Sequence, residues 1–264
     1  MLVSEVMLQQ TPVARVLPAW HRWLERWPAP AALAAEPAGE AIRMWDRLGY
    51  PRRALRLHAA AVAVVERHGG EVPQDHDALL ALPGVGGYTA AAVASFAFGR
   101  RHAVLDTNVR RVLARVVVGT RYPPPALTAA ERALAEDLLP DEAAVAARWG
   151  VATMELGALV CTARSPRCGD CPVARLCRWR LDGWPEHTGP PRRGQAYEGT
   201  DRRVRGLILA ALRQADGPVT REHLVEAAPD DVLRDPGQRD RALDGLVADG
   251  LVEPLDGGLF RLPV

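Results

Sequence analysis

The stretch Leu82–Asn108, LPGVGGYTAAAVASFAFGRRHAVLDTN, decides the fold of this chain. It opens with a turn in which three glycines surround one valine: Gly84, Val85, Gly86 and Gly87. An alanine-rich segment, Thr89–Phe98, follows the turn and is predicted to be a buried helix. A G-x-G turn before a helix directs backbone N–H groups at an anion, and the helix dipole adds partial positive charge there. The turn can therefore hold one phosphate without a cationic side chain.

A polar trio, Asp106-Thr107-Asn108, ends the same stretch after the apolar residues Ala103-Val104-Leu105. Glycine turns between helices are common and often bind nothing, so the turn alone is weak evidence. Beside a phosphate site, however, a carboxylate just downstream is well placed to act on a nucleotide. The order of turn, helix and Leu-Asp-x-Asn-Val-x-Arg resembles the helix-hairpin-helix superfamily of DNA glycosylases.

Charge is unevenly distributed along the 264 residues, although the formal net charge is only +1. All 33 basic residues are arginine. Six arginines and one acid lie between positions 100 and 121, and ten arginines outnumber five acids between positions 164 and 205. Basic regions on a near-neutral protein are typical of a localised nucleic-acid footprint, although a genomic preference for arginine gives the same composition.

The sequence shows neither an N-terminal targeting signal nor an apolar run that we expect to span a bilayer. Ser4 and Glu5 interrupt the first apolar segment. We therefore expect a cytoplasmic protein with no membrane partner. Disulfides are rare in that reducing compartment, so the four cysteines are expected to have another role.

Apolar residues recur at helical spacing through the first two-thirds of the chain, with glycine and proline at the turns. After a first helix that ends near Pro12, the predicted helices cover residues 13–27, 40–48, 53–68, 75–82, 89–98, 129–139 and 141–160. No alternating run indicates a sheet before residue 200. The predicted fold class is all-α, with one helical lobe at residues 1–99 and a second at residues 100–181.

Composition changes after residue 181. Residues 182–200 are rich in glycine, proline and arginine and are predicted to be a linker. Residues 201–264 then predict three helices, the second capped by Thr220, and a terminal hairpin around Asp256-Gly257-Gly258. This order indicates a small winged-helix-like module, which either touches DNA or serves as a packing or protein-contact unit.

All four cysteines lie in one loop with the spacing C-x6-C-x2-C-x5-C: Cys161, Cys168, Cys171 and Cys177. Zinc sites usually pair two C-x2-C units, or one such unit with two histidines, at a longer separation. Four thiolates in one compact loop favour a [4Fe–4S] cluster, with zinc or unligated thiols as the alternatives. The spacing matches the endonuclease III and MutY branch of the superfamily. Because five arginines surround the loop, we expect a structural cluster that braces a basic surface against DNA phosphates.

The first segment, SEVMLQQT at positions 4–11, resembles the adenine-specific, MutY-type branch, whose members remove adenine mispaired with oxidised guanine. Glu5 stands where that branch carries an acid and the lyase branch an apolar residue. A carboxyl of raised pKa in an apolar pocket can protonate N7 of adenine and so improve the leaving group. The resemblance assigns Asp106 to stabilise the oxocarbenium-like sugar and Asn108 to hydrogen-bond within the site. Taken by itself, Glu5 is expected to be a solvated helical residue.

Position 88 separates the two branches. The bifunctional relatives carry a lysine there, which forms a Schiff base and nicks the strand. Here the residue is Tyr88, and the chain has no lysine at all. We therefore expect base removal without efficient strand cleavage, whether Tyr88 takes part in the site or only packs against the core.

Base removal requires that the nucleotide leave the duplex and that the gap be filled. Gln9 and Tyr50 match the family's residues that wedge into the helix. Tyr50 is expected to be exposed because Gly49 and Pro51 interrupt the helix around it, although a tyrosine capping the core is the alternative interpretation. The remaining DNA contacts that the resemblance implies are Gln10, Gly84, Val85, Gly86, Gly87 and Thr89.

The resemblance covers residues 1–180 and implies a monomer that acts on duplex DNA with a mismatched or oxidised base. The chain departs from the family twice. A further segment usually precedes the catalytic helix, and many members carry a β-rich Nudix-like domain, for which the tail after residue 200 is too short and too helical. Two other functions stay open: a glycosylase for mismatched thymine or uracil, and a DNA-binding protein with a structural cluster and no activity.

Overall fold

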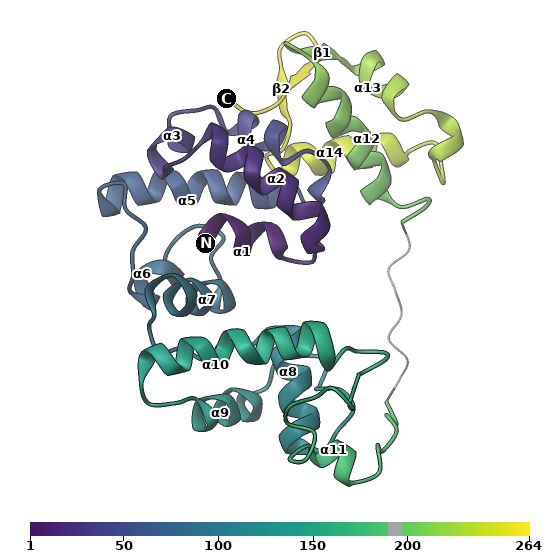
Figure 1. Ribbon diagram of the computed structural model, residues 1–264. Coiled ribbons are helices and arrows are strands. Elements are labelled where there is room, and N and C mark those ends of the chain that lie inside the picture. The colour runs from purple at the N-terminus through teal and green to yellow at the C-terminus, as the bar shows by residue number, and fades with distance from the viewer. Residues whose placement is uncertain (190–196) are drawn as a thin grey trace. The chain divides into compact units, whose positions relative to one another are not determined.

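The structure is a computed structural model that describes residues 1–189 and 197–264. Within the predicted linker, residues 190–196 lie outside the described residues. The chain divides into two compact units, coloured by residue number in Figure 1. The cluster unit consists of Met1, Gln74–Ala81 and Val85–Arg192, and the terminal unit of Leu2–Pro73, Leu82–Gly84 and Arg193–Val264. The domain boundaries given by the sequence remain predictions.

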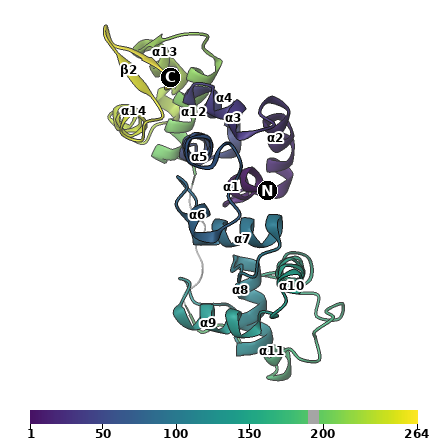
Figure 2. The same cartoon turned by 90° about the vertical axis from the view of Figure 1, so that its left-hand side faces the viewer.

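The terminal unit begins with a helical bundle. Its elements are α1 (Leu2–Leu8), α2 (Val13–Arg26), α3 (Pro30–Ala34), α4 (Ala38–Trp45), the 3-10 turn η1 (Asp46–Leu48) and α5 (Arg52–His68). Helices α3 and α4 pack against α5 (Figure 2). The rings of Trp23 and Trp27 meet edge to face at 4.7 Å, and Trp45 meets Trp23 at 5.8 Å. These buried indoles form the centre of the bundle.

The tail forms the C-terminal module of the same unit. It contains α12 (Asp201–Gln214), β1 (Val219–Thr220), α13 (Arg221–Ala227), η4 (Asp230–Val232), α14 (Gln238–Ala248), β2 (Glu253–Leu255) and β3 (Leu259–Arg261). The antiparallel sheet has the strand order β1-β3-β2. Thr220 caps α13 as predicted, because its hydroxyl accepts the N–H of His223 at 3.4 Å. Strand β1 was not predicted, since two residues cannot show an alternating pattern.

The C-terminal module shares one apolar core with the bundle. The N–H of Gly39 donates to the Pro263 carbonyl at 2.7 Å, and a Cβ on Gly39 would lie 2.6 Å from that oxygen. Nε of Arg213 donates to the Ile42 carbonyl at 3.0 Å. These contacts fix α12 and the segment after β3 against α4, so the module is an integral part of the terminal unit.

Over its described residues the cluster unit contains helices and loops and no strand. It contains α6 (His76–Leu80), α7 (Gly87–Phe98), α8 (Thr107–Leu113), the π-helical turn η2 (Ala114–Val118), α9 (Ala129–Leu138), α10 (Ala143–Glu155), a second π-helical turn η3 (Leu156–Val160) and α11 (Arg178–Leu181). Residues 89–95 of α7 are all buried, as the alanine-rich pattern predicted. Helix α10 packs on α7 and α8. Helices dominate the described chain, which confirms the predicted all-α class.

One expectation from the sequence needs correction. Helix α10 and η3 form a single helix, Ala143–Val160, whose 18 residues have a mean hydropathy of 1.2. By length and composition alone it could cross a bilayer, although no such run was expected. Alanine accounts for much of this apolar character, and the helix packs on α7 and α8.

Candidate active site

Asp106 is the N-cap of α8 in the cluster unit. Its Oδ1 accepts the backbone N–H groups of Asn108 at 2.9 Å and Val109 at 2.6 Å. Its Oδ2 accepts a hydrogen bond from Nδ2 of Asn108 at 2.7 Å. Three hydrogen bonds therefore fix the carboxylate at the positive end of a helix, where the dipole favours negative charge. The structure thus brings together the predicted partners Asp106 and Asn108.

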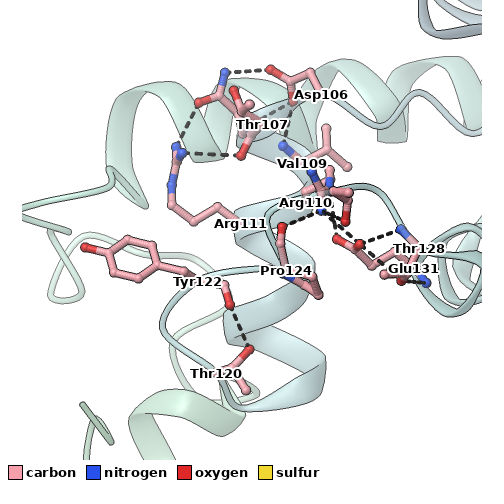
Figure 3. A network of polar contacts seen from close by, with 12 residues as sticks. Asp106, Thr107, Val109, Arg110, Arg111, Thr120, Tyr122, Pro124, Thr128 and Glu131 are labelled. Carbon is pink, nitrogen blue, oxygen red and sulfur yellow. Dashed lines mark hydrogen bonds and ion pairs between the residues drawn. The ribbon is translucent and has the colours of Figure 1, made fainter. Parts of the chain in front are cut away.

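Arg111 continues this network away from Asp106 (Figure 3). Its Nη2 donates to Oδ1 of Asn108 at 2.8 Å and to the Gly157 carbonyl at 2.6 Å, and its Nε donates to the Cys161 carbonyl at 2.8 Å. Arg111 is 9% exposed. The planar guanidinium of Arg111 therefore orients the amide of Asn108. The same guanidinium hydrogen-bonds to Cys161, the first residue of the cysteine loop, and so links the loop to Asn108.

Gly157 makes this arrangement possible. A Cβ at position 157 would lie 2.7 Å from Cβ of Asn108 and 2.8 Å from its carbonyl oxygen. Backbone atoms cannot move aside as a flexible side chain can, so only glycine lets η3 approach the start of α8 this closely. The Asn108 amide and the cysteine loop are held together by that contact.

A partly buried ion pair supports the other side of α8 (Figure 3). Nε of Arg110 lies 2.8 Å from Oε1 of Glu131, and the side chains are 11% and 15% exposed. Glu131 also completes a capping box with Thr128 at the start of α9. Burial opposes ionisation of Glu131, but hydrogen bonds from Arg110 and Thr128 outweigh it and hold the pKa of the carboxyl below its ordinary value of 4.5.

The glycine turn has the geometry that its sequence predicts. Gly84 adopts φ +76°, and a Cβ there would lie 2.5 Å from Cβ of Arg56. Gly86 is the N-cap of α7 and Gly87 its first residue, and a Cβ on either would meet nothing within 4 Å. The start of α7 is therefore open to close approach by an anion.

The neighbours of these glycines are less exposed. Val85 is 7% exposed and Thr89 is 2% exposed, so the side chain of Thr89 is directed into the core. The DNA contact predicted for Thr89 is therefore one that its backbone would make. Tyr88 is half-buried and packs against Ala91, Ala92 and Val104. Tyr88 therefore packs against the core, which is one of the two expectations for this residue.

Glu5 lies in α1 of the terminal unit and is 8% exposed. Val6 and Met7, which follow it, are buried as well. A solvated glutamate was the expectation for Glu5 without the family resemblance, and that expectation is wrong. Burial in general disfavours the charged form of a carboxyl, and a proton donor must hold its proton until the reaction.

A buried arginine ties the end of α1 to the turn before α5. Nη1 of Arg53 donates to the Gln9 carbonyl at 2.6 Å and Nη2 donates to the Gly49 carbonyl at 3.0 Å. Burial lowers the pKa of the Arg53 guanidinium to about 10, which still leaves it charged at neutral pH. The predicted wedge residues Gln9 and Tyr50 are thereby held in one region of the terminal unit.

The backbone in this region is strained. Gln10 has φ +56° and Tyr50 has φ +47°, a conformation that costs a non-glycine residue about 1–3 kcal/mol. Tyr50 is 43% exposed, as expected from the flanking Gly49 and Pro51. Gln9, Gln10 and Tyr50 line the same groove. Strain that surrounding contacts maintain at exposed polar and aromatic residues is typical of a binding site.

The four cysteines line one pocket of the cluster unit. Burial raises the pKa of the Cys171 thiol, and the thiols of Cys161, Cys177 and Cys168 raise it further. Among the described residues, no group of three or more potential ligands is arranged around a single metal ion. Four mutually close thiols around a shared pocket nevertheless fit a four-iron cluster, which is larger than one ion and requires four thiolates.

Arg115 packs against this pocket with only 1% of its surface exposed. Its Nη1 lies 3.3 Å from Sγ of Cys161 and donates to the Thr162 carbonyl at 2.8 Å, while its guanidinium lies over the Trp179 ring at 4.8 Å. Arg115 therefore connects η2 to the first residues of the cysteine loop. The predicted arginines of the loop are all exposed: Arg164, Arg167, Arg175, Arg178 and Arg180.

Three residues of the site were missed by sequence reasoning: Arg53, Arg111 and Gly157. Arg111 stands within the Leu-Asp-x-Asn-Val-x-Arg pattern, which was the one signal that it had a role. No local pattern distinguishes Arg53 or Gly157, because the contacts that bury them include partners more than forty residues away in the chain.

Comparison with known proteins agrees with this architecture. Residues 3–136 match the HhH-GPD superfamily of base excision DNA repair proteins. Residues 161–177 match the iron–sulfur binding domain of endonuclease III, and the four cysteines bind a [4Fe–4S] cluster.

Proteins of several organisms are similar in sequence to this chain. An adenine DNA glycosylase of Mycobacterium tuberculosis is 52% identical over 99% of this chain and 84% of its own length. The human adenine DNA glycosylase is 44% identical over 67% of this chain and 33% of its own length. Among solved structures, a thermostable thymine-DNA glycosylase has a TM-score of 0.60 at 31% identity, covering 69% of this chain and 83% of that one. A non-covalent endonuclease III–DNA complex has a TM-score of 0.60 at 28% identity, with coverages of 69% and 83%.

The fold and the iron–sulfur loop define a base excision repair protein of the helix-hairpin-helix class. Within that class, the identity across nearly the whole chain is to the adenine-specific enzymes. The chain belongs to the adenine DNA glycosylase family.

Proposed function

We propose that this enzyme excises adenine paired with 8-oxoguanine or guanine in duplex DNA and leaves the strand intact. The observation that supports the proposal most is the Asp106 carboxylate, held by Asn108 at 2.7 Å at the start of α8. A fixed carboxylate at that position suits a reaction in which positive charge develops on a sugar.

Glu5 and Asp106 have different roles in the proposed reaction. Glu5 donates its proton to N7 of adenine, the bond between N9 and C1′ of the sugar breaks, and the base leaves as neutral adenine. Asp106 stabilises the positive charge on the sugar. Water then adds to C1′ and returns its proton to the Glu5 carboxylate, which restores the enzyme and leaves an abasic site.

Strand cleavage is not part of this reaction. Without lysine the chain has no side-chain amine to form an imine with the opened sugar. The phenol at Tyr88 occupies the position after the glycine turn and cannot replace an amine in this role. The product is therefore an intact strand that breaks only when alkali is added.

DNA is the partner, and the remaining predicted residues serve to hold it. The glycine turn at 84–87 binds one backbone phosphate through N–H groups. Gln9 and Tyr50 fill the space that the extruded adenine leaves, and Gln10 makes a further DNA contact. The cluster supplies a rigid support for the exposed arginines of its loop. We infer that the enzyme works as a monomer in the cytoplasm.

Single-turnover base release tests the proposal. The parent protein is mixed in excess with duplexes that carry adenine opposite 8-oxoguanine, adenine opposite guanine, or thymine or uracil opposite guanine. We expect release from the adenine duplexes only, with strand breaks after alkali. Release of thymine or uracil would assign the protein to the other glycosylase branch, and salt-sensitive binding without any release would make it a non-catalytic DNA-binding protein.

A further inference from the structure

A groove of about 1400 Å³ lies between the C-terminal module and the bundle, wholly within the terminal unit. Its lining includes nine arginines and two carboxylates. We call it the arginine groove. Its α12 wall belongs to the C-terminal module, which lies beyond both family matches.

The walls of the arginine groove come from α12 and, far away in the sequence, from η1 and α5. Arg202, Arg205 and Arg213 recur at intervals of three and eight residues and place their side chains on one face of α12. Arg47, in η1, and Arg56, in α5, are exposed on the opposite wall. Because the shared core and the hydrogen bond from Arg213 to the Ile42 carbonyl fix α12 to the bundle, the spacing of these walls is set by the fold.

The two carboxylates do not neutralise this charge. Asp249 lies 3.1 Å from Arg52 and also pairs with Arg205, so one acid serves two arginines. Asp46 is exposed and lies within electrostatic range of Arg213. The groove therefore keeps a large excess of positive charge, which attracts a polyanion more strongly than a single small anion.

Other surfaces of the C-terminal module carry paired charges instead. On α14, Arg239 lies 2.8 Å from Asp230, and Arg241 lies 2.7 Å from Asp235. On the terminal hairpin, Arg261 lies 2.9 Å from Glu253. The helix and hairpin that a winged-helix module commonly offers to DNA are thus locally balanced, whereas the lining of the arginine groove, taken as a whole, is not.

We propose that the arginine groove binds the phosphodiester backbone of duplex DNA, with α12 as the contact that the C-terminal module provides. Gln9, Gln10 and Tyr50 line the same groove, so the backbone held there is continuous with the duplex at the wedge residues. The inference deepens the proposed function, because it takes DNA as the partner, but it does not depend on which base is removed.

Two matched pairs of variants test this inference. Arg202→Ala removes one exposed positive charge from the groove wall, and Arg241→Ala removes the same charge from α14. Gly206→Glu places a carboxylate inside the groove, where an added Cβ would meet only Oη of Tyr197 at 3.8 Å, and Gly217→Glu adds the same charge where nothing lies within 4 Å. Thermal unfolding of all four checks that each variant folds.

The measurement is the affinity for an undamaged duplex by fluorescence anisotropy at several salt concentrations. One phosphate contact contributes a factor of about eight at ~0.1 M salt, and its loss reduces the slope of log K against log salt by about one. We expect such losses for Arg202→Ala and larger ones for Gly206→Glu, with Arg241→Ala and Gly217→Glu close to the parent.

The inference is overturned if both groove variants bind like the parent, or if each control weakens binding as much as its partner. Undamaged duplex contains no base to release, so this result is separate from the base-release assay. A parent that binds through the groove but releases no adenine would contradict the proposed function and leave the groove assignment intact.

Discussion

Arg111 and Cys161 join the candidate active site to the iron–sulfur loop: Nε of Arg111 donates to the Cys161 carbonyl at 2.8 Å. The same guanidinium orients Asn108, which in turn holds Asp106. The position of the candidate catalytic carboxylate thus depends on the loop that binds the cluster. This relationship gives the cluster a structural consequence for the reaction without any electron transfer.

Arg111→Lys tests that dependence. Lysine keeps the charge but cannot reach Asn108, Gly157 and Cys161 together, because it lacks the planar fork. Each lost bond to a charged group costs about 1.5–3 kcal/mol, so we expect a lower thermal midpoint, less iron per protein and slower base release. Arg148→Lys, at an exposed position of α10, is the control. Iron content and a thermal midpoint like those of the parent in Arg111→Lys would show that the link from Asn108 to Cys161 contributes neither to stability nor to cluster binding.

Asp106 has two roles that substitution can separate. Asparagine caps helices about as well as aspartate, whereas alanine loses about 1 kcal/mol. We expect Asp106→Asn and Asp106→Ala to slow single-turnover base release equally, by about 10²-fold or more, while only Asp106→Ala loses the stability of the cap. Base release at the parent rate in Asp106→Asn would reduce this residue to a helix cap.

The Arg110–Glu131 pair predicts a pH dependence of stability. Because the pKa of Glu131 in the folded protein lies below 4.5, its contribution is fully present above that ordinary value. It is lost as the pH falls through the lower folded value. Thermal unfolding at pH 7 should therefore show Glu131→Gln less stable than the parent by about 1.5–3 kcal/mol. That difference should shrink below pH ~4, and a constant difference down to pH ~2 would contradict the assignment.

The sequence predicted the parts of this protein that depend on local pattern. The glycines at 84, 86 and 87, the cysteine spacing and the helical periodicity indicated the fold class and the cluster, and each depends on residues close together in the chain. The helix expected over residues 89–98 begins two residues earlier, at Gly87. Boundaries of this kind depend on capping contacts that a periodic pattern does not contain.

The remaining features arise from contacts across the chain. Helix α8 was not predicted as a separate element, because only seven residues, Thr107–Leu113, form it before the π-helical turn. Arg53 looks like any exposed arginine in the sequence, yet its 6% exposure follows from carbonyl groups of α1. The roles of Arg111 and Gly157 likewise follow from packing between α8 and η3, which no single segment encodes.

Base release by Glu5→Gln tests the central claim, which is that the buried carboxyl on α1 supplies the proton for adenine departure. Glutamine has nearly the same shape and cannot donate that proton, so fold and duplex affinity should be retained. We expect single-turnover release of adenine opposite 8-oxoguanine to slow by at least about 10²-fold, with duplex affinity and thermal midpoint like the parent. Release at the parent rate would contradict the account.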